Sequence, residues 1–272
     1  MYWFFKSPGP ETSASRRRYG WRRDLHDERD LMMYPAPPAA PVGKGVDLRA
    51  KCPPVYDQGQ LGSCTAMAIC AAFQFDEMSQ GEHSAPIPSR LFLYFNERAA
   101  EGTTSEDSGA SIRDGFKSLA REGVCPEPMW PYCVDRFAEK PGPECYQAAL
   151  AHRAVSYRRL RQELGELLRC LDDGYPFVFG ILVYPSFETA PGGRVPMPDR
   201  KKEQLLGGHA VMIVGYSPQE KVLIGRNSWG AAWGDHGYFY LPYEYALDRT
   251  LTSDIWCVSK VSDAPAAEPL HD

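Results

Sequence analysis

The sequence lacks any apolar run long enough to cross a membrane. Its longest apolar stretches, FVFGILVY at 177–184 and HAVMIVGY at 209–216, have the length of β-strands, whereas a membrane helix needs about 20 such residues. The first residues, MYWFFKSPGP, reach a lysine and two prolines too soon for a signal peptide. We therefore expect no membrane partner, and a protein that is either cytoplasmic or exported without a signal peptide.

Closely spaced cysteine pairs are also missing. Among the eight cysteines, Cys125, Cys133 and Cys145 are too far apart for the cysteine pairs of a zinc ribbon. We therefore expect no metal site and no cofactor. If Cys64 is free, an odd number of cysteines remains, so complete disulfide pairing is excluded. Buried thiols and one local bridge are both compatible with the pattern.

A strong excess of charge is absent as well. The formal net charge is −5, which argues against nucleic acid as a partner. Residues 1–45 are nonetheless net basic, through SRRRYGWRR at 15–23, and contain the Pro/Ala linker YPAPPAAPV at 34–42. We predict an N-terminal arm over 1–45, one domain over 46–261 and a disordered tail over 262–272.

The order of the expected elements separates helices from strands. Within residues 46–175, the apolar spacing predicts helices at 64–78, 89–100, 111–123 and 162–174. Within residues 176–261, the pattern changes to strand-like runs such as FVFGILVY, HAVMIVGY and KVLIGRNS. Helices first and strands second indicate an α+β protein with two lobes.

Three polar or nucleophilic residues stand at positions where they could do chemistry. Cys64 heads the apolar helix in LGSCTAMAIC, so it is either a nucleophile or a small buried side chain. The turn SPQE at 217–220 joins two predicted strands and sets His209 opposite Asn227 in an antiparallel hairpin. The asparagine oxygen can accept a hydrogen bond from one imidazole nitrogen and leave the other nitrogen free. His209 is therefore either a catalytic group or a satisfied core histidine.

Taken together, three segments resemble the papain-like (C1) cysteine peptidase family. They are DQGQLGSC with Gln58 and Cys64, GGHAVMIVGY with His209, and GRNSWGAAWGDHGY with Asn227. The resemblance runs from about Val46 to residue 261, and phrases such as SRLFLYFNERAAEG are similar to short bacterial members. It implies a papain-like fold with a mainly helical left lobe, an antiparallel β-barrel right lobe and an active-site cleft between them.

The resemblance also implies a role for each matched residue. Cys64 is the expected nucleophile, with a thiol pKa depressed by the helix dipole and by protonated His209. His209 is the expected acid and base, and Asn227 orients its ring. The side-chain amide of Gln58 and the backbone N–H of Cys64 are expected to form the oxyanion hole.

Residues around this set are expected to complete the cleft. Trp229 would shield the histidine–asparagine bond from water, and Trp233 would line the leaving-group side. The expected substrate groove consists of Gly109, Ala110, Ser111, Ile112 and Gly208. The DSGAS segment at 107–111 is equally compatible with the plain start of a helix.

Two positions depart from the family pattern. Leu61 stands where the family usually has a half-cystine, so we expect that bridge to be absent. Thr65 replaces the usual aromatic residue after the nucleophile, so we expect altered packing at the head of the helix.

The arm is too short for the long helical pro-segment that is usual in the family. We predict that it crosses or borders the cleft as an inhibitor, with Tyr19, Trp21 and Leu25 as its docking side chains. The alternative, that it packs on the back of the domain, is left open.

The leading hypothesis is a cysteine endopeptidase that hydrolyses peptide bonds of polypeptide substrates through a thioester acyl-enzyme, as a monomer. One alternative is a cysteine-dependent amide transferase, deamidase or isopeptidase, which would use the same triad. A second alternative is a non-catalytic interaction protein whose arm permanently fills the cleft.

Overall fold

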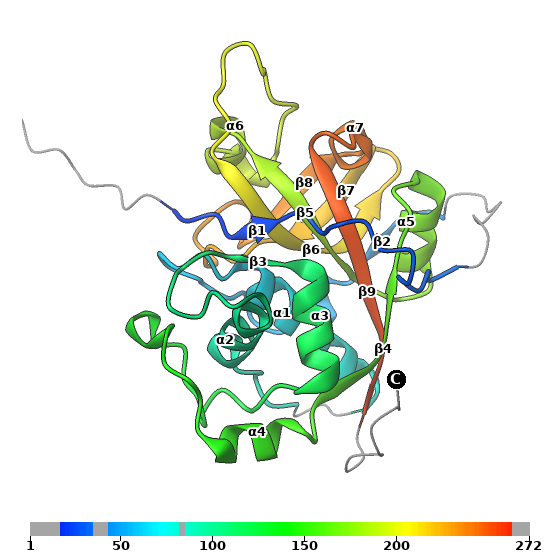
Figure 1. Ribbon diagram of the computed structural model, residues 1–272. Coiled ribbons are helices and arrows are strands. Elements are labelled where there is room, and N and C mark those ends of the chain that lie inside the picture. Colours follow the sequence, from blue (N-terminus) through cyan, green and yellow to red (C-terminus); the bar gives the residue numbers. More distant parts are fainter. Residues whose placement is uncertain (1–16, 35–42, 82–84, 263–272) are drawn as a thin grey trace, which may run out of the picture.

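Two halves of the molecule have different architectures, and the α+β prediction is confirmed (Figure 1). The computed structural model describes residues 17–34, 43–81 and 85–262. Helices gather in the lower half of Figure 1 and an antiparallel sheet forms the upper half. All of the predicted linker at 34–42 except Tyr34, and all of the predicted tail at 262–272 except residue 262, lie outside the described residues.

The helical half is built around a helix that is buried along nearly its whole length. Its helices are α1 (Cys64–Ser79), α2 (Arg90–Glu101), α3 (Ile112–Arg121) and α4 (Pro143–Ala149). α1 is apolar on nearly every side, as expected for a central helix. Ser89 starts α2 by accepting a hydrogen bond from the backbone N–H of Phe92, which satisfies one of the free N–H groups of the first turn. None of the helices that the structure describes is long and apolar enough to cross a membrane.

The other half is a seven-stranded antiparallel sheet with the strand order β4-β9-β5-β6-β7-β8 and a short strand β2 paired with β6. The strands are β2 (Val46–Asp47), β4 (Arg153–Arg159), β5 (Phe177–Val183), β6 (Gly207–Ser217), β7 (Val222–Arg226), β8 (Tyr238–Pro242) and β9 (Thr252–Ser262). Short helices flank the sheet: α5 (Leu164–Asp172), α6 (Pro185–Glu188) and α7 (Tyr243–Leu247). The remaining helical turns are η1 (Arg49–Lys51), η2 (Val134–Arg136) and η3 (Pro191–Gly193).

Strands β5 and β6 read as continuous apolar runs because both faces of the sheet are covered. Val178 and Met212 belong to the core cluster that contains α1, whereas Phe179 and Val211 belong to the cluster on the opposite face. Burial of each such side chain stabilises the fold by about 1.5–3 kcal/mol. The sheet thereby fixes β6 directly against α1, which sets the relative position of the two halves.

The N-terminal arm lies between the two halves. Its strand β1 (Trp21–Arg22) pairs in parallel with β3 (Ala110–Ser111), which immediately precedes α3. In Figure 1 this segment, in blue, crosses the molecule between the helices and the sheet. The arm therefore packs at the junction of the halves and not on the back of the domain.

Candidate active site

Cys64 is the first residue of α1 and its side chain is fully buried. The preceding turn is held in place by Asp107, whose carboxylate accepts a hydrogen bond from the backbone N–H of Gly62 at 3.0 Å. The phenol of Tyr132 bonds to the hydroxyl of Ser63 at 2.6 Å. These contacts hold the thiol at the positive end of the helix dipole.

His209 and Asn227 meet side by side, as the hairpin predicts. The Oδ1 atom of Asn227 lies 2.8 Å from Nε2 of His209, and both side chains are buried. The ring of Trp229 stacks on the imidazole with 4.9 Å between the ring centroids. Nδ1 of His209 has no hydrogen-bond partner among the described residues. One ring nitrogen is thus fixed and the other is available for proton transfer.

Gln58 carries the expected polar side chain beside the cysteine turn. Its Nε2 group donates to the carbonyl of Leu61 at 2.9 Å and to the arm carbonyl of Arg18 at 3.3 Å. Its Oε1 atom accepts from the hydroxyl of Ser228 at 2.7 Å, which fixes the orientation of the amide. The donor that would stabilise an oxyanion is therefore occupied by the backbone of the arm.

The arm residue nearest to the nucleophile is Gly20. Backbone groups of Gly20 and Ala210 hydrogen-bond the thiol of Cys64. The carbonyl of Gly20 accepts from the backbone N–H of Ala110 at 2.8 Å. A Cβ atom built on Gly20 would overlap the carbonyl oxygen of Gly62, so the backbones approach more closely than any side chain would allow.

Burial under the arm makes both members of the cysteine–histidine pair neutral. Loss of water raises the pKa of Cys64 to about 11. Hydrogen bonds from the backbone lower this pKa, but by less than burial raises it. Burial lowers the pKa of His209 to about 4, despite its bond to Asn227. The prediction of a depressed thiol pKa is therefore wrong for the arm-bound state, because desolvation exceeds the helix dipole there.

The two arm aromatics dock on either side of Gly20. Trp21 is 5% exposed and lies against Gly180 and Gly208, where a Cβ on either glycine would overlap it. Tyr19 packs edge-on to His209, with 6.2 Å between the ring centroids, and its hydroxyl bonds to Glu188. The prediction for these two side chains is confirmed.

Leu25 was expected to dock as well, and that prediction is wrong. Its side chain is 85% exposed, whereas the preceding residue, Asp24, contacts the domain through Asp254. Arg17, which precedes the docked aromatics in the arm, makes a contact that was not predicted. Its guanidinium carbon lies 4.3 Å from the ring centroid of Trp229.

The remaining groove candidates divide into two groups. Gly109 and Ala110 touch the arm backbone, whereas Ser111 caps α3 by accepting from the N–H of Asp114, and Ile112 is buried in the core. The segment therefore serves at once as an edge strand of the cleft and as a helix start.

Trp233 lies next to the shielding tryptophan. Its ring meets that of Trp229 edge-on at a centroid separation of 5.0 Å, and its indole N–H donates to the carbonyl of Glu188 at 2.8 Å. The two tryptophans form one apolar wall beside the imidazole.

Two buried carboxylates near the nucleophile were not predicted. Asp107 holds the cysteine turn, and Glu97 on α2 accepts a hydrogen bond from the hydroxyl of Thr65 at 2.5 Å. Thr65 thus replaces an aromatic packing contact with a polar one. Asp107 lies in DSGAS and Glu97 in SRLFLYFNERAAEG, but nothing in either segment marks the acidic residue as a neighbour of Cys64, so only the folded structure shows its position.

Comparison with known proteins agrees with this geometry. A family model described as "Papain family cysteine protease" matches residues 42–253. The chain belongs to the papain family of cysteine peptidases. It is a papain-like cysteine peptidase, and all eight of its cysteines are free thiols in the structure.

Relatives at different distances share this fold. An uncharacterized peptidase C1-like protein of Acanthamoeba polyphaga mimivirus is 43% identical over 218 residues, which cover 76% of this chain and 70% of the viral protein. Xylellain, a cysteine protease from Xylella fastidiosa, is 40% identical with a TM-score of 0.83, over 92% of this peptidase and 98% of xylellain. The digestive procathepsin L 3 of Tenebrio molitor is 20% identical with a TM-score of 0.65, over 87% and 74% of the two chains, and shows the fold alone.

Proposed function

We propose that this peptidase hydrolyses peptide bonds of polypeptide substrates through Cys64, His209 and Asn227, and that its own N-terminal arm inhibits it. The bond between His209 and Asn227 is the observation that carries the proposal, together with the contacts of Gln58 and Cys64 to neighbouring residues of the arm. No metal or cofactor is needed for the reaction.

The chemistry begins when the arm leaves and water enters the cleft. Rehydration lowers the thiol pKa and raises that of the imidazole, so the proton of Cys64 can move to Nδ1 of His209. The thiolate attacks the substrate carbonyl, and Gln58 Nε2 with the N–H of Cys64 stabilises the oxyanion. The amine leaves with the histidine proton, and a thioester remains. Water, deprotonated by His209, then releases the acid and the thiol.

The arm occupies the groups that would bind a substrate carbonyl. The thiol is hydrogen-bonded by the backbone of Gly20, while Gln58 binds the carbonyl of Arg18 and Ala110 binds that of Gly20. The proposed oxyanion-hole donor is therefore taken by an arm carbonyl. A polypeptide substrate can reach this donor only after the arm has left.

A substitution that adds one methyl group to the arm tests the proposed inhibition. Gly20→Ala should expel the arm, because the new Cβ overlaps the Gly62 carbonyl oxygen, and should raise the hydrolysis of denatured, fluorophore-quenched casein at least tenfold. Leu25→Ala is the matched control, since that side chain is exposed on the same arm, and should stay within about twofold of wild type.

The nucleophile is tested in the same background. Cys64→Ser added to Gly20→Ala should abolish casein hydrolysis, because the weakly acidic hydroxyl does not form the anion at neutral pH. Residual hydrolysis by the double variant would exclude Cys64 as the nucleophile. If Gly20→Ala exposes the Ala110 amide to hydrogen exchange but leaves hydrolysis unchanged, the inhibitory role of the arm is refuted.

A further inference from the structure

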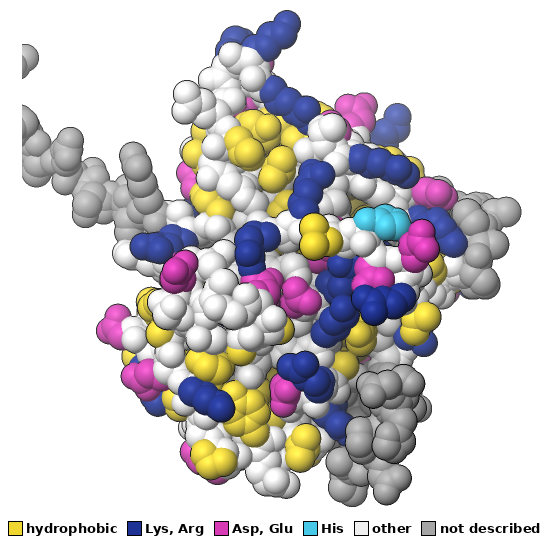
Figure 2. Space-filling model, in the orientation of Figure 1, with side chains coloured by type: hydrophobic (Ala, Val, Ile, Leu, Met, Phe, Trp, Pro, Cys, Tyr) yellow, Lys and Arg dark blue, Asp and Glu magenta, His cyan; other side chains and the backbone are white. Residues whose placement is uncertain are grey.

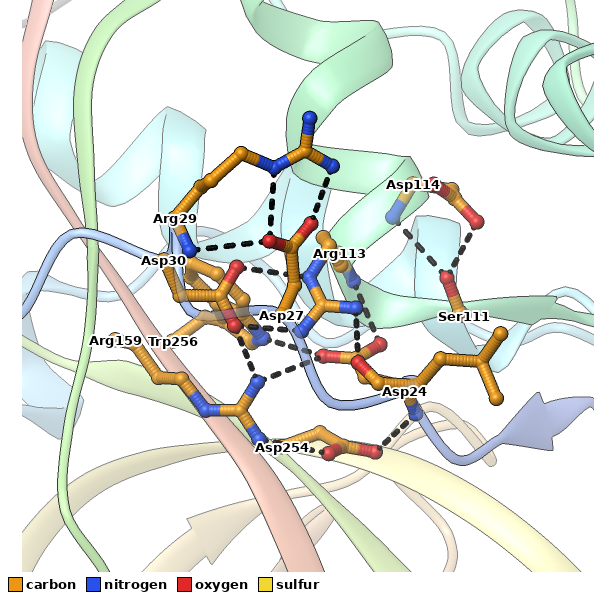
Figure 3. A network of polar contacts seen from close by, with 11 residues as sticks. Asp24, Asp27, Arg29, Asp30, Ser111, Arg113, Asp114, Arg159, Asp254 and Trp256 are labelled. Atoms are coloured by element: carbon orange, nitrogen blue, oxygen red, sulfur yellow. Dashed lines mark hydrogen bonds and ion pairs between the residues drawn. The ribbon is translucent and has the colours of Figure 1, made fainter.

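Beyond Trp21 the arm continues into a cluster of charges remote from the catalytic groups. Figure 3 shows the arm carboxylates Asp24 and Asp30 facing the guanidinium groups of Arg113 and Arg159. Arg113 lies in the first turn of α3 and Arg159 at the end of β4. Figure 2 shows basic and acidic side chains interspersed across the middle of this face.

Asp24 is bound entirely by groups of the peptidase domain. Its Oδ1 atom accepts from the backbone N–H of Arg113 at 3.1 Å, and its Oδ2 atom from the indole N–H of Trp256 at 2.8 Å. Its own backbone N–H donates to Asp254 at 2.8 Å. The side chain is 0% exposed, so this carboxyl group is fully removed from water.

Asp30 bridges the two arginines. One oxygen lies 2.9 Å from Nε of Arg113, and the other lies 2.5 Å from Nη2 of Arg113 and 2.7 Å from Nη1 of Arg159. Such a two-point contact with one guanidinium is the strong form of an ion pair. Asp254 approaches Arg159 from the domain side at 3.3 Å.

We propose that Arg113, Arg159 and Trp256 form a carboxylate-binding site that recognises Asp24 and Asp30 of the arm, and that this site controls how tightly the arm closes the cleft. This regulatory consequence rests on the proposed inhibition by the arm. The site itself is defined by contacts that do not involve the catalytic residues.

The balance of charge makes this site respond to acid. Three carboxyl groups, Asp24, Asp30 and Asp254, share two guanidinium groups, and Asp24 is brought beside Asp254 only when the arm docks. Other charged or titratable groups line the two pockets around the cluster. They are His26, Asp27, Glu28 and Arg29 on the arm, Lys117 on α3, Tyr157 and Arg158 on β4, and Arg161, Glu163 and Arg249. Docking is therefore easiest when one carboxyl group carries a proton.

The direction of the pH dependence follows from the difference between the pKa of Asp24 in the docked arm and in the released arm. Burial, and next the charge of Asp254, raise the pKa of Asp24 from 3.8 to about 6 in the docked arm. An arm released into water regains the ordinary value, so at Asp24 docking takes up a proton, and this contribution is favoured by acid. Asp24 alone should tighten docking roughly tenfold from pH 7 to pH 5. Docking also lowers the pKa of His209 from 6.5 to about 4, which releases a proton and acts in the opposite direction, so the contribution of Asp24 is measured as the difference between wild type and an Asp24 variant.

Hydrogen exchange of the Ala110 amide measures docking without using catalysis, because that N–H donates to the Gly20 carbonyl of the arm. In the full-length chain the ratio of its protection factor in wild type to that in Asp24→Asn should rise roughly tenfold from pH 7 to pH 5, because only wild type can protonate this side chain. The amide of the variant can accept only one of the two N–H bonds that Asp24 accepts, so its protection should lie below that of wild type at pH 5. Asp30→Asn should lose at least tenfold protection at both pH values, because its two arginines lose their shared partner.

Asp27→Asn is the matched control, since it removes the same charge from the same segment but its paired partner is Arg29 within the arm. Its protection should follow wild type. The Val124 amide, which bonds to His152 inside the domain at 3.0 Å, reports whether each variant is folded. A ratio of wild-type to Asp24→Asn protection that does not rise from pH 7 to pH 5, or an Asp30→Asn variant as strongly protected as wild type, would overturn the proposal.

Hydrolysis measured on the same samples separates the two proposals. If the arm inhibits, casein hydrolysis should fall where protection of the Ala110 amide rises among these variants at pH 7. Protection that changes as predicted while hydrolysis does not would keep the carboxylate-binding site and refute the inhibition.

Discussion

Among the described residues, one hydrogen bond holds the imidazole of His209, and its proposed role as a base depends on that bond. Asn227 accepts from Nε2 at 2.8 Å, and the same oxygen accepts from the backbone N–H of Ser228 at 2.8 Å. The second contact fixes the amide before a substrate arrives. The stacked Trp229 ring keeps water from competing for the acceptor.

Removal of the acceptor should therefore lower turnover more than binding. In the Gly20→Ala background, Asn227→Ala should reduce kcat by roughly ten- to a hundredfold with little change in KM, because the ring loses its orientation. Asn227→Asp keeps an oxygen at the same place and should retain more activity. It should also move the alkaline limb of the pH–rate profile upward, because a carboxylate stabilises the imidazolium ion. A change confined to KM would contradict the orienting role.

At the scale of elements, the head of α1 depends on a buried carboxyl group. Glu97 on α2 is fully buried, accepts from Thr65 at 2.5 Å, and its Oε2 atom has no hydrogen-bond partner among the described residues. Burial raises the pKa of Glu97 to about 8, more than its hydrogen bond lowers it. The group is therefore protonated in the native state at neutral pH.

This raised value makes stability depend on pH. Because the folded pKa of Glu97 lies above the unfolded value, its contribution is fully present below the unfolded pKa and is lost as the pH rises through about 8. Between pH 5 and pH 8 the loss should be on the order of 3 kcal/mol. Glu97→Gln should remove that part of the slope, as measured by urea unfolding at both pH values. Parallel curves for the two proteins would show that Glu97 is not the source.

Most of the helices and strands could be predicted from the sequence, because the patterns that indicate them lie within short segments. The apolar run of α1, the Ser89 cap of α2 and the apolar strands β5 and β6 lie within short windows. The pairing of β1 with β3 is different, since each strand has two residues and they come from distant parts of the chain. No periodicity marks such a short strand.

At the scale of the whole molecule, the same distinction separates the proposed catalytic residues from the arm that covers them. Cys64, His209 and Asn227 belong to motifs that can be recognised in the sequence. The neutral state of the cysteine–histidine pair could not be predicted, because the arm that excludes water from the pair is remote in sequence. Asp24 and Arg113 likewise become partners only when the arm is laid across the junction.

The arm-closed state can be tested directly by the reactivity of Cys64 toward iodoacetamide at pH 7, read by peptide mass spectrometry. Cys133 is exposed and serves as an internal reference on the same molecule. In wild type, Cys64 should react no faster than Cys133, because its thiol is buried and its pKa is raised to about 11. In Gly20→Ala, Cys64 should react at least tenfold faster than in wild type while Cys133 is unchanged. Equal Cys64 rates in the two proteins would contradict an arm that silences the nucleophile.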